Sequence, residues 1–153
     1  MLGAGVYSIL SEKTLPESRK TMIVWEGNSL VVTLFRTWAK ASVSDYFLAY
    51  QSMVNHHPQG EWVKIIDFTD YVETSDLLGL LYAEELKQIR KDIAEWSVKR
   101  GMIRQVIILD PAIPDEVIDQ LIQIYDNAGA PAETVTTRHQ ANVRAEEVLK
   151  GHD

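Results

Sequence analysis

Four carboxylates recur at every third position in one short stretch of the chain. They are Asp67, Asp70, Glu73 and Asp76. The first of them, Asp67, is the next-to-last residue of a mostly apolar run that ends at Phe68. Carboxylate oxygens are the ligands that Mg²⁺ and Ca²⁺ prefer, so the spacing allows a divalent cation site. However, calcium loops usually carry a glycine for their tight turn, and this stretch has none. We therefore favour a solvated loop that caps a helix, and we expect neither a metal nor another cofactor.

A second arrangement with catalytic potential joins Asp67 to Asp110, because each residue follows a predicted strand. Two carboxylates at neighbouring strand ends can raise one another's pKa, which would suit a metal-assisted hydrolase. The chain offers no nucleophile elbow, phosphate-binding loop or dinucleotide fingerprint to accompany them. Strand-end Asp residues also form turns, especially Asp110 before Pro111. We expect a protein that is not an enzyme and keep the hydrolase as an alternative.

The composition is that of a single globular domain. Of the 153 residues, 46% are hydrophobic and 24% are charged, which allows a sizeable core and is unlike a disordered chain. Cys is absent, which excludes disulfides and thiolate chemistry and suits a cytoplasmic location. No stretch is apolar over the roughly 18 to 20 residues that a membrane span needs. The net charge of −7, without a Lys/Arg cluster, argues against nucleic acid as a partner.

The elements before the acidic stretch can be predicted from their side chains. Residues 22–26 and 30–38 are rich in β-branched and aromatic residues, and the Gly27-Asn28 pair between them supplies the positive φ angles of a tight hairpin. An amphipathic helix follows, with its apolar residues at spacings of three and four. Residues 62–68 then form a nearly continuous apolar run, which predicts a strand covered by helices.

After the acidic stretch, helices alternate with strands. Thr74 or Ser75 is expected to cap one long helix over 75–100, whose core stripe is Leu78, Tyr82, Leu86, Ile89, Ile93 and Trp96. A fourth strand over 104–109, a helix that begins at Pro114, a fifth strand over 133–139 and a short terminal helix complete the chain.

This order predicts an α/β fold. Its mixed sheet has four to five strands, and the N-terminal hairpin is followed by right-handed β-α-β units. We expect residues 1–20 to form an arm, either loose or laid on a sheet edge, and residues 21–150 to form the one domain. The strand ends should bring Asp67, the acidic loop and Asp110 to one edge, where α/β proteins commonly bind ligands.

Three segments carry a family resemblance: the hairpin 22–38, the strand 63–68 and the run Thr74-Ser75-Asp76-Leu77-Leu78-Gly79. They resemble the STAS domain and anti-sigma-factor antagonist superfamily, which has the SpoIIAA-like fold. After the equivalent strand, those proteins carry Asp-Ser-Ser/Thr-Gly-Leu-Gly at a helix start, and a partner kinase phosphorylates the second hydroxyl. The alignment of the final Leu-Gly places Asp76 at that hydroxyl, where it cannot be phosphorylated in the same way. An Asp there could mimic the phosphorylated state, or the chain could belong to a divergent branch of small bacterial proteins with this fold and no known switch. We favour the resemblance to the divergent branch, which covers about residues 22–150.

The resemblance implies a regulatory or protein-interaction module without catalytic activity. Its interaction loop would contain Asp67, Asp70, Glu73, Thr74, Ser75, Asp76 and Leu77, with Asp110 as a secondary candidate. The concentrated negative charge beside exposed apolar residues such as Leu77 would favour a protein partner with a basic surface. A homodimer through the hairpin edge or the arm is also possible, because an open sheet edge must be covered.

A binding module for a small apolar or amphipathic ligand is the first alternative. The ligand would lie between the sheet and the helix 75–100, and the same fold class houses the lipid-binding CRAL-TRIO domains. The four Trp residues of the chain could line such a pocket, although single Trp residues in strands and helices mostly pack in the core.

Overall fold

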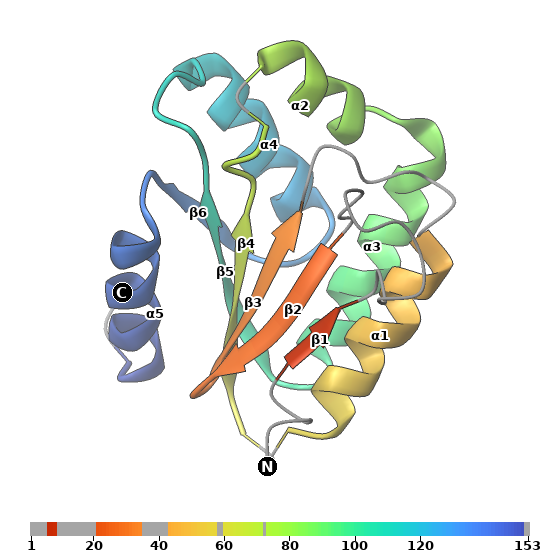
Figure 1. Cartoon of the computed structure of the whole chain (residues 1–153), viewed down its shortest axis with the longest axis vertical. Coiled ribbons are helices and arrows are strands. Elements are labelled where there is room, and N and C mark those ends of the chain that lie inside the picture. Colours follow the sequence, from red (N-terminus) through yellow and green to blue (C-terminus); the bar gives the residue numbers. More distant parts are fainter. Residues whose placement is uncertain (1–5, 9–20, 35–42, 58–59, 72, 152–153) are drawn as a thin grey trace.

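A mixed sheet of six strands forms the centre of the part of the chain that the structure describes (Figure 1). The structure is a computed structural model, and it describes residues 6–8, 21–34, 43–57, 60–71 and 73–151. The strands lie in chain order across the sheet: β1 (Val6–Ser8), β2 (Thr21–Glu26), β3 (Ser29–Leu34), β4 (Trp62–Asp67), β5 (Met102–Ile108) and β6 (Ala132–Val135). The helices are α1 (Val43–Asn55), α2 (Thr74–Leu81), α3 (Glu84–Val98), α4 (Asp115–Asn127) and α5 (Arg138–Leu149). Within these residues, no helix is long and apolar enough to cross a membrane.

The strand directions confirm the predicted α/β fold with a mixed sheet. β1, β2 and β3 pair antiparallel, whereas β3, β4, β5 and β6 run parallel to one another. The three-residue β1 pairs with β2 at the edge of the sheet, so this part of the segment 1–20 is laid on a sheet edge. The rest of that segment, and residues 35–38 of the predicted hairpin strand, lie outside the described residues.

The hairpin between β2 and β3 turns where the sequence predicts. Glu26 pairs with Ser29 across the two-residue turn, and Gly27 has a φ of 62°. Glycine adopts this left-handed conformation at little cost because it has no Cβ atom. Asn28 does not have a positive φ, so the prediction of positive angles at both turn residues is wrong. A two-residue turn can take its unusual angle at the first position alone, where glycine is then preferred.

Helices cover both faces of the sheet, but unequally. α1, α2, α3 and α4 lie on one face, and α5 lies alone on the other (Figure 1). Because side chains alternate along a strand, β4 sends Trp62 and Ile66 into the larger core and Val63 and Ile65 into the core under α5. The three crossovers from β3 to β6 carry their helices on the same face and step the same way across the sheet. Repeated connections of one hand produce this arrangement.

The long helix predicted over 75–100 is two helices in the structure. α2 ends at Leu81, Ala83 is extended with φ −65° and ψ 120°, and α3 begins at Glu84. Gly79 within α2 is a poor helix former. The break lets α2 pack against both α3 and α4, at the end of the sheet toward which β3 points (Figure 1). Tyr82, which was predicted in the core stripe, is 46% exposed as a result.

The C-terminal part also differs from the prediction. β6 ends at Val135, whereas the predicted strand extends to residue 139. The Thr137 side chain accepts a hydrogen bond from the Gln140 amide, and the Gln140 side chain accepts one from the Thr137 amide. This capping box starts α5 at Arg138 and removes residues 138 and 139 from the strand.

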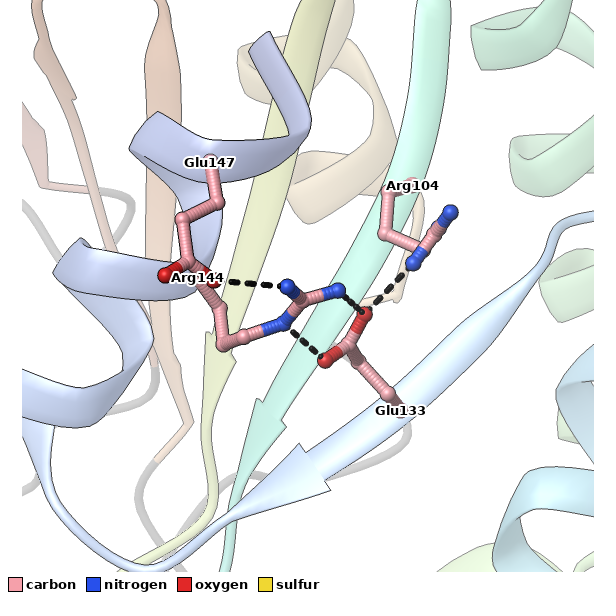
Figure 2. A network of polar contacts seen from close by, with 4 residues as sticks. All are labelled: Arg104, Glu133, Arg144 and Glu147. Atoms are coloured by element: carbon pink, nitrogen blue, oxygen red, sulfur yellow. Dashed lines mark hydrogen bonds and ion pairs between the residues drawn. The ribbon is translucent and has the colours of Figure 1, made fainter. Parts of the chain in front are cut away.

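A charged network holds α5 near β5 and β6 (Figure 2). Glu133 on β6 receives two hydrogen bonds from the Arg144 guanidinium, from Nε at 2.6 Å and from Nη2 at 2.9 Å. Arg104 on β5 donates to the same carboxylate at 2.6 Å, and Arg144 also donates to Glu147 at 2.7 Å. Every charge of this network therefore has a partner of opposite sign.

Under α5, the small side chains of Ala141 and Ala145 are buried in the core.

Candidate ligand-binding site

The structure brings the predicted strand-end carboxylates to one edge of the sheet. β4 and β5 are parallel neighbours, and Asp67 pairs with Ile108 two residues before Asp110. Asp67 Oδ1 accepts hydrogen bonds from the Thr69 amide at 2.9 Å and from Thr69 Oγ1 at 2.6 Å. Asp110 Oδ1 accepts one from the Ala112 amide at 2.8 Å. Both carboxylates thus close local turns, which is the structural role that strand-end Asp residues commonly have.

The acidic loop between β4 and α2 is exposed at most of its described residues. Asp70, Glu73 and Ser75 are exposed, Thr74 is half-buried, and the side chain of Asp76 lies outside the described residues. Glu73, rather than Thr74 or Ser75, occupies the N-cap position of α2, and its side chain makes no capping hydrogen bond. In the part of the chain that the structure describes, no three His, Asp or Glu side chains gather closely enough to hold a metal ion.

Leu77 lies in the core and not on the surface of this loop. Its side chain is fully buried in the cluster formed by the sheet and α1 to α4. The prediction of an exposed apolar residue at the start of the helix is therefore wrong. α2 packs against α3 and α4, and this packing covers the first turn of the helix. Leu77 anchors the acidic loop and does not offer an apolar contact to a partner.

A cavity lies between the sheet and α3, close to the carboxyl ends of β3 and β4. Its floor is formed by Lys64 and Ile66 of β4 and by Gln105 of β5. Its apolar wall comes chiefly from α3, with Leu86, Ile89, Ile93 and Ala94. The cavity is partly open to solvent. The volume that the centres of water molecules can occupy in it is about 70 Å³. A polar floor against an apolar wall is the general form of a small-molecule site.

Lys64 is the unusual residue of this cavity. It is the third residue of β4, so strand alternation places it with Trp62 and Ile66 on the face that α1 to α4 cover. Only 5% of its surface is exposed, and no carboxylate of the described residues lies within ion-pairing distance of its Nζ. Burial lowers the pKa of Lys64 from 10.5 to about 7, because an ammonium ion loses its hydration there. Near neutral pH the amine is therefore present in both charged and neutral forms.

Tyr50 of α1 provides the contact that the structure records for this amine. Lys64 Nζ lies 4.5 Å from the centroid of the Tyr50 ring, within the range of a cation–π interaction. The Tyr50 hydroxyl and Ser97 Oγ are hydrogen-bonded, and Ser97 Oγ donates to the Ile93 carbonyl at 2.6 Å. Since Ser97 has one hydroxyl hydrogen, the Tyr50 hydroxyl is the donor between them. Tyr50 thus faces Lys64 with its ring, while its hydroxyl is used elsewhere.

Two further tyrosines and one arginine complete the polar lining. Tyr46 comes from α1 and Tyr125 from α4, and burial raises the pKa of both hydroxyls, so both are neutral at physiological pH. The guanidinium carbon of Arg90 lies 5.9 Å from the centroid of the Tyr125 ring. Arg90 also opposes the rise in the Tyr125 pKa through its charge and a hydrogen bond. The described lining of the cavity therefore contains two basic side chains, Lys64 and Arg90, and no carboxylate.

The position of this cavity was predicted only as an alternative, and its residues were not predicted. Trp25, Trp62 and Trp96 do not line it, and Trp38 lies outside the described residues. Trp62 instead packs in the core and donates through Nε1 to the Arg100 carbonyl at 2.8 Å. The sequence contained a signal for these residues. Lys64 and Gln105 are polar residues within otherwise apolar strands, at positions where the side chain points into the core.

Comparison with known proteins adds no assignment to this geometry. No protein-family model, curated protein or solved structure matches the chain. The fold and the site together define an α/β protein with a mixed sheet and a lysine-containing cavity beneath its longest described helix.

Proposed function

We propose that the protein is a non-enzymatic binding module that holds a small amphipathic ligand in the cavity between the sheet and α3. The polar end of the ligand lies at Lys64, and its apolar part lies along Leu86, Ile89 and Ile93. One observation carries the proposal: a lysine that is 95% buried has no carboxylate partner in the described part of the chain.

Physical chemistry gives this observation its weight. A charge buried without a partner costs several kcal/mol, and a neutral amine still gives up hydrogen bonds to water. An apolar residue of similar length would fill the same position without that cost. A ligand that accepts hydrogen bonds from Lys64 would offset the cost, because binding to the folded state alone stabilises it.

The STAS-like resemblance supports the same reading of the fold. A hairpin followed by sequential parallel strands, with their crossover helices on one face, is consistent with a SpoIIAA-like sheet. Lipid-binding CRAL-TRIO domains belong to the same fold class, so a ligand between sheet and helix suits this architecture. The absence of Cys supports a cytoplasmic location for the module.

Native mass spectrometry and thermal unfolding test the proposal together. We expect freshly purified protein to carry a co-purified small molecule, or the ligand-free protein to gain thermal stability from short amphiphiles such as hexanoate, hexanamide or hexan-1-ol. Lys64→Met should lose the response to probes that bind at the amine. Lys87→Met should retain it, because Lys87 is exposed on α3 and paired with Glu84 at 2.9 Å. A bare polypeptide mass together with no response to any probe would contradict the proposal.

A second candidate function uses the acidic loop to bind a protein with a basic surface. Asp70 and Glu73 favour it, because both are exposed at the carboxyl edge of the sheet. Charges of this kind act mainly by steering encounter, so the interaction should weaken as salt increases. Asp70→Lys with Glu73→Lys should leave the fold intact and abolish capture of such a partner at low salt. Equal capture by the double variant and the wild type would exclude this role.

A further inference from the structure

The cavity between the sheet and α3 has a positive electrostatic bias in an acidic protein. The chain has a net charge of −7, yet the ionisable residues among the described lining of the cavity are two bases and two neutral tyrosines. Lys64 lies at the floor, and Arg90 reaches the cavity from α3. A negatively charged ligand would be stabilised there by the buried ammonium of Lys64, because electrostatic interactions are stronger in a buried site than in water.

The floor of the cavity matches a group with two adjacent acceptor oxygens. Lys64 and Gln105 are partners in register on the parallel strands β4 and β5, so their side chains leave the same face of the sheet side by side. Gln105 is 1% exposed, and its amide nitrogen reaches the Ala130 carbonyl only at 3.5 Å. That distance is at the limit of a hydrogen bond and leaves donor capacity on the amide. An ammonium and an amide donor side by side suit a carboxylate.

The size and polarity of the cavity limit what is attached to that group. Leu86, Ile89 and Ile93 offer an apolar wall to an alkyl chain, and about 70 Å³ is available to the centres of water molecules. A phosphate ester would bring about two negative charges and three acceptor oxygens to a floor that offers one ammonium, at Lys64, with Arg90 on α3 as the second base of the cavity. A carboxylate brings one charge, and a short alkyl chain fills the remaining apolar space.

We propose that this cavity binds a short-chain monocarboxylate, with its carboxylate on Lys64 Nζ and the Gln105 amide and its alkyl chain against α3. This inference rests on the proposed function and names the chemical class of its ligand. The binding is reversible and involves no covalent step.

A dependence on pH follows from the state of the amine. The carboxylate binds the protonated form of Lys64, which becomes the minor form above pH 7 in the ligand-free protein. Burial raises the pKa of Tyr46, Tyr50 and Tyr125, so these three hydroxyls stay neutral between about pH 6 and 9. Arg90 is the other basic side chain of the cavity. Binding therefore takes up a proton above pH 7, and affinity falls by up to about tenfold per pH unit.

Calorimetric titration with butanoate and hexanoate tests the inference, with butanamide and hexanamide as neutral analogues. We expect the wild type to bind hexanoate about 25-fold more weakly at pH 8.5 than at pH 6.5, in proportion to the protonated fraction of an amine with a pKa near 7. Hexanamide should show no such dependence. In Lys64→Met the affinity for hexanoate should fall at least about tenfold, whereas Lys87→Met should bind as the wild type does.

The outcomes separate this inference from the proposed function. Binding of hexanamide or hexan-1-ol without any preference for hexanoate would overturn the carboxylate and leave the binding module standing. Failure of every probe would overturn both. Hexanoate binding that is equally strong in Lys64→Met would also overturn the inference. If Lys64→Met does not fold, the pH dependence of the wild type decides, since it requires no variant.

Discussion

The two faces of the sheet handle buried charge in opposite ways. Beneath α5, Glu133 is surrounded by the guanidinium groups of Arg104 and Arg144, and Arg144 is paired again with Glu147 (Figure 2). Beneath α3, Lys64 is more deeply buried than any member of that network, yet its recorded contact is an aromatic ring. The first face contains a completed ion network, and the second contains an amine with no carboxylate partner among the described side chains.

The effects on pKa have opposite physical causes. Hydrogen bonds from Arg144 lead the effects that lower the pKa of Glu133, so its environment favours the charged form. The environment of Lys64 favours the neutral form, because burial removes the water that hydrates an ammonium ion. A network whose charges stabilise one another has a structural role in the fold. A buried amine whose charged form is not stabilised by its surroundings is a candidate for binding a ligand.

Lys64→Met should give the largest change in stability. We expect the free energy of unfolding at pH 7 to rise by about 3 kcal/mol, because an apolar side chain of similar length removes the cost of burying the amine. Urea unfolding measures the change, and Lys87→Met on the exposed face of α3 should stay within about 0.5 kcal/mol of the wild type. A loss of stability in Lys64→Met would mean that Lys64 is compensated within the protein.

Glu133→Gln should give a smaller change of opposite sign. We expect a loss of about 2 kcal/mol, because Arg104 and Arg144 keep their charges and lose a charged acceptor in a partly exposed site. The carboxylate contributes its stability above its ordinary pKa of 4.5, and that contribution is lost as the pH falls through its lower folded-state pKa. Glu84→Gln, in an exposed pair with Lys87, is the matched control and should cost less than about 0.5 kcal/mol. Equal effects in the two variants would show that the network contributes no more than a surface pair.

The stability of the wild type should also depend on pH through Lys64. Between the folded-state pKa of about 7 and the ordinary value of 10.5, the unfolded chain binds a proton that the folded chain does not. The free energy of unfolding therefore rises with pH, and we expect about 1 kcal/mol per pH unit from about pH 7.5 to 9. Lys64→Met should remove this rise. Parallel curves for the wild type and the variant would contradict the lowered pKa.

Asp110→Asn should have the smallest effect. The carboxylate accepts one hydrogen bond from the Ala112 amide, and an Asn side chain can form the same turn. We expect a loss of no more than about 0.5 kcal/mol in urea unfolding. A larger loss would show that the negative charge itself is needed at this edge, in contrast to the role of a turn former. Asp67→Asn serves as a comparison, because Asp67 accepts from both the amide and the hydroxyl of Thr69.

Most of the fold could be predicted from local pattern. The hairpin, the parallel strands and α4 were recognisable because alternation, turn residues and helical spacing agree with one another at each of them. The break between α2 and α3 was missed because Tyr82 continues the apolar spacing of the helix, and the spacing does not reveal that α2 must pack on α4 as well. The capping box at Thr137 was missed because residues 133–139 also fit a weak strand.

The candidate site was harder to predict because it depends on tertiary packing. Asp67 and Asp110 attract attention as chemical groups, but the structure gives each a partner in its own turn. Lys64 looks like one base among many carboxylates in the sequence, and its burial follows only from the helices that cover β4. A polar residue inside a strand that is apolar on both faces is the signal that would have identified it.

A direct NMR titration of the Lys64 amine tests the central claim, that this lysine is buried with no carboxylate partner among the described side chains and binds an anionic ligand. We expect a pKa of about 7 in the ligand-free protein and a clear rise when hexanoate is added. A pKa near the ordinary value of 10.5 in the free protein would contradict the account, because it would show that the amine is hydrated or already paired.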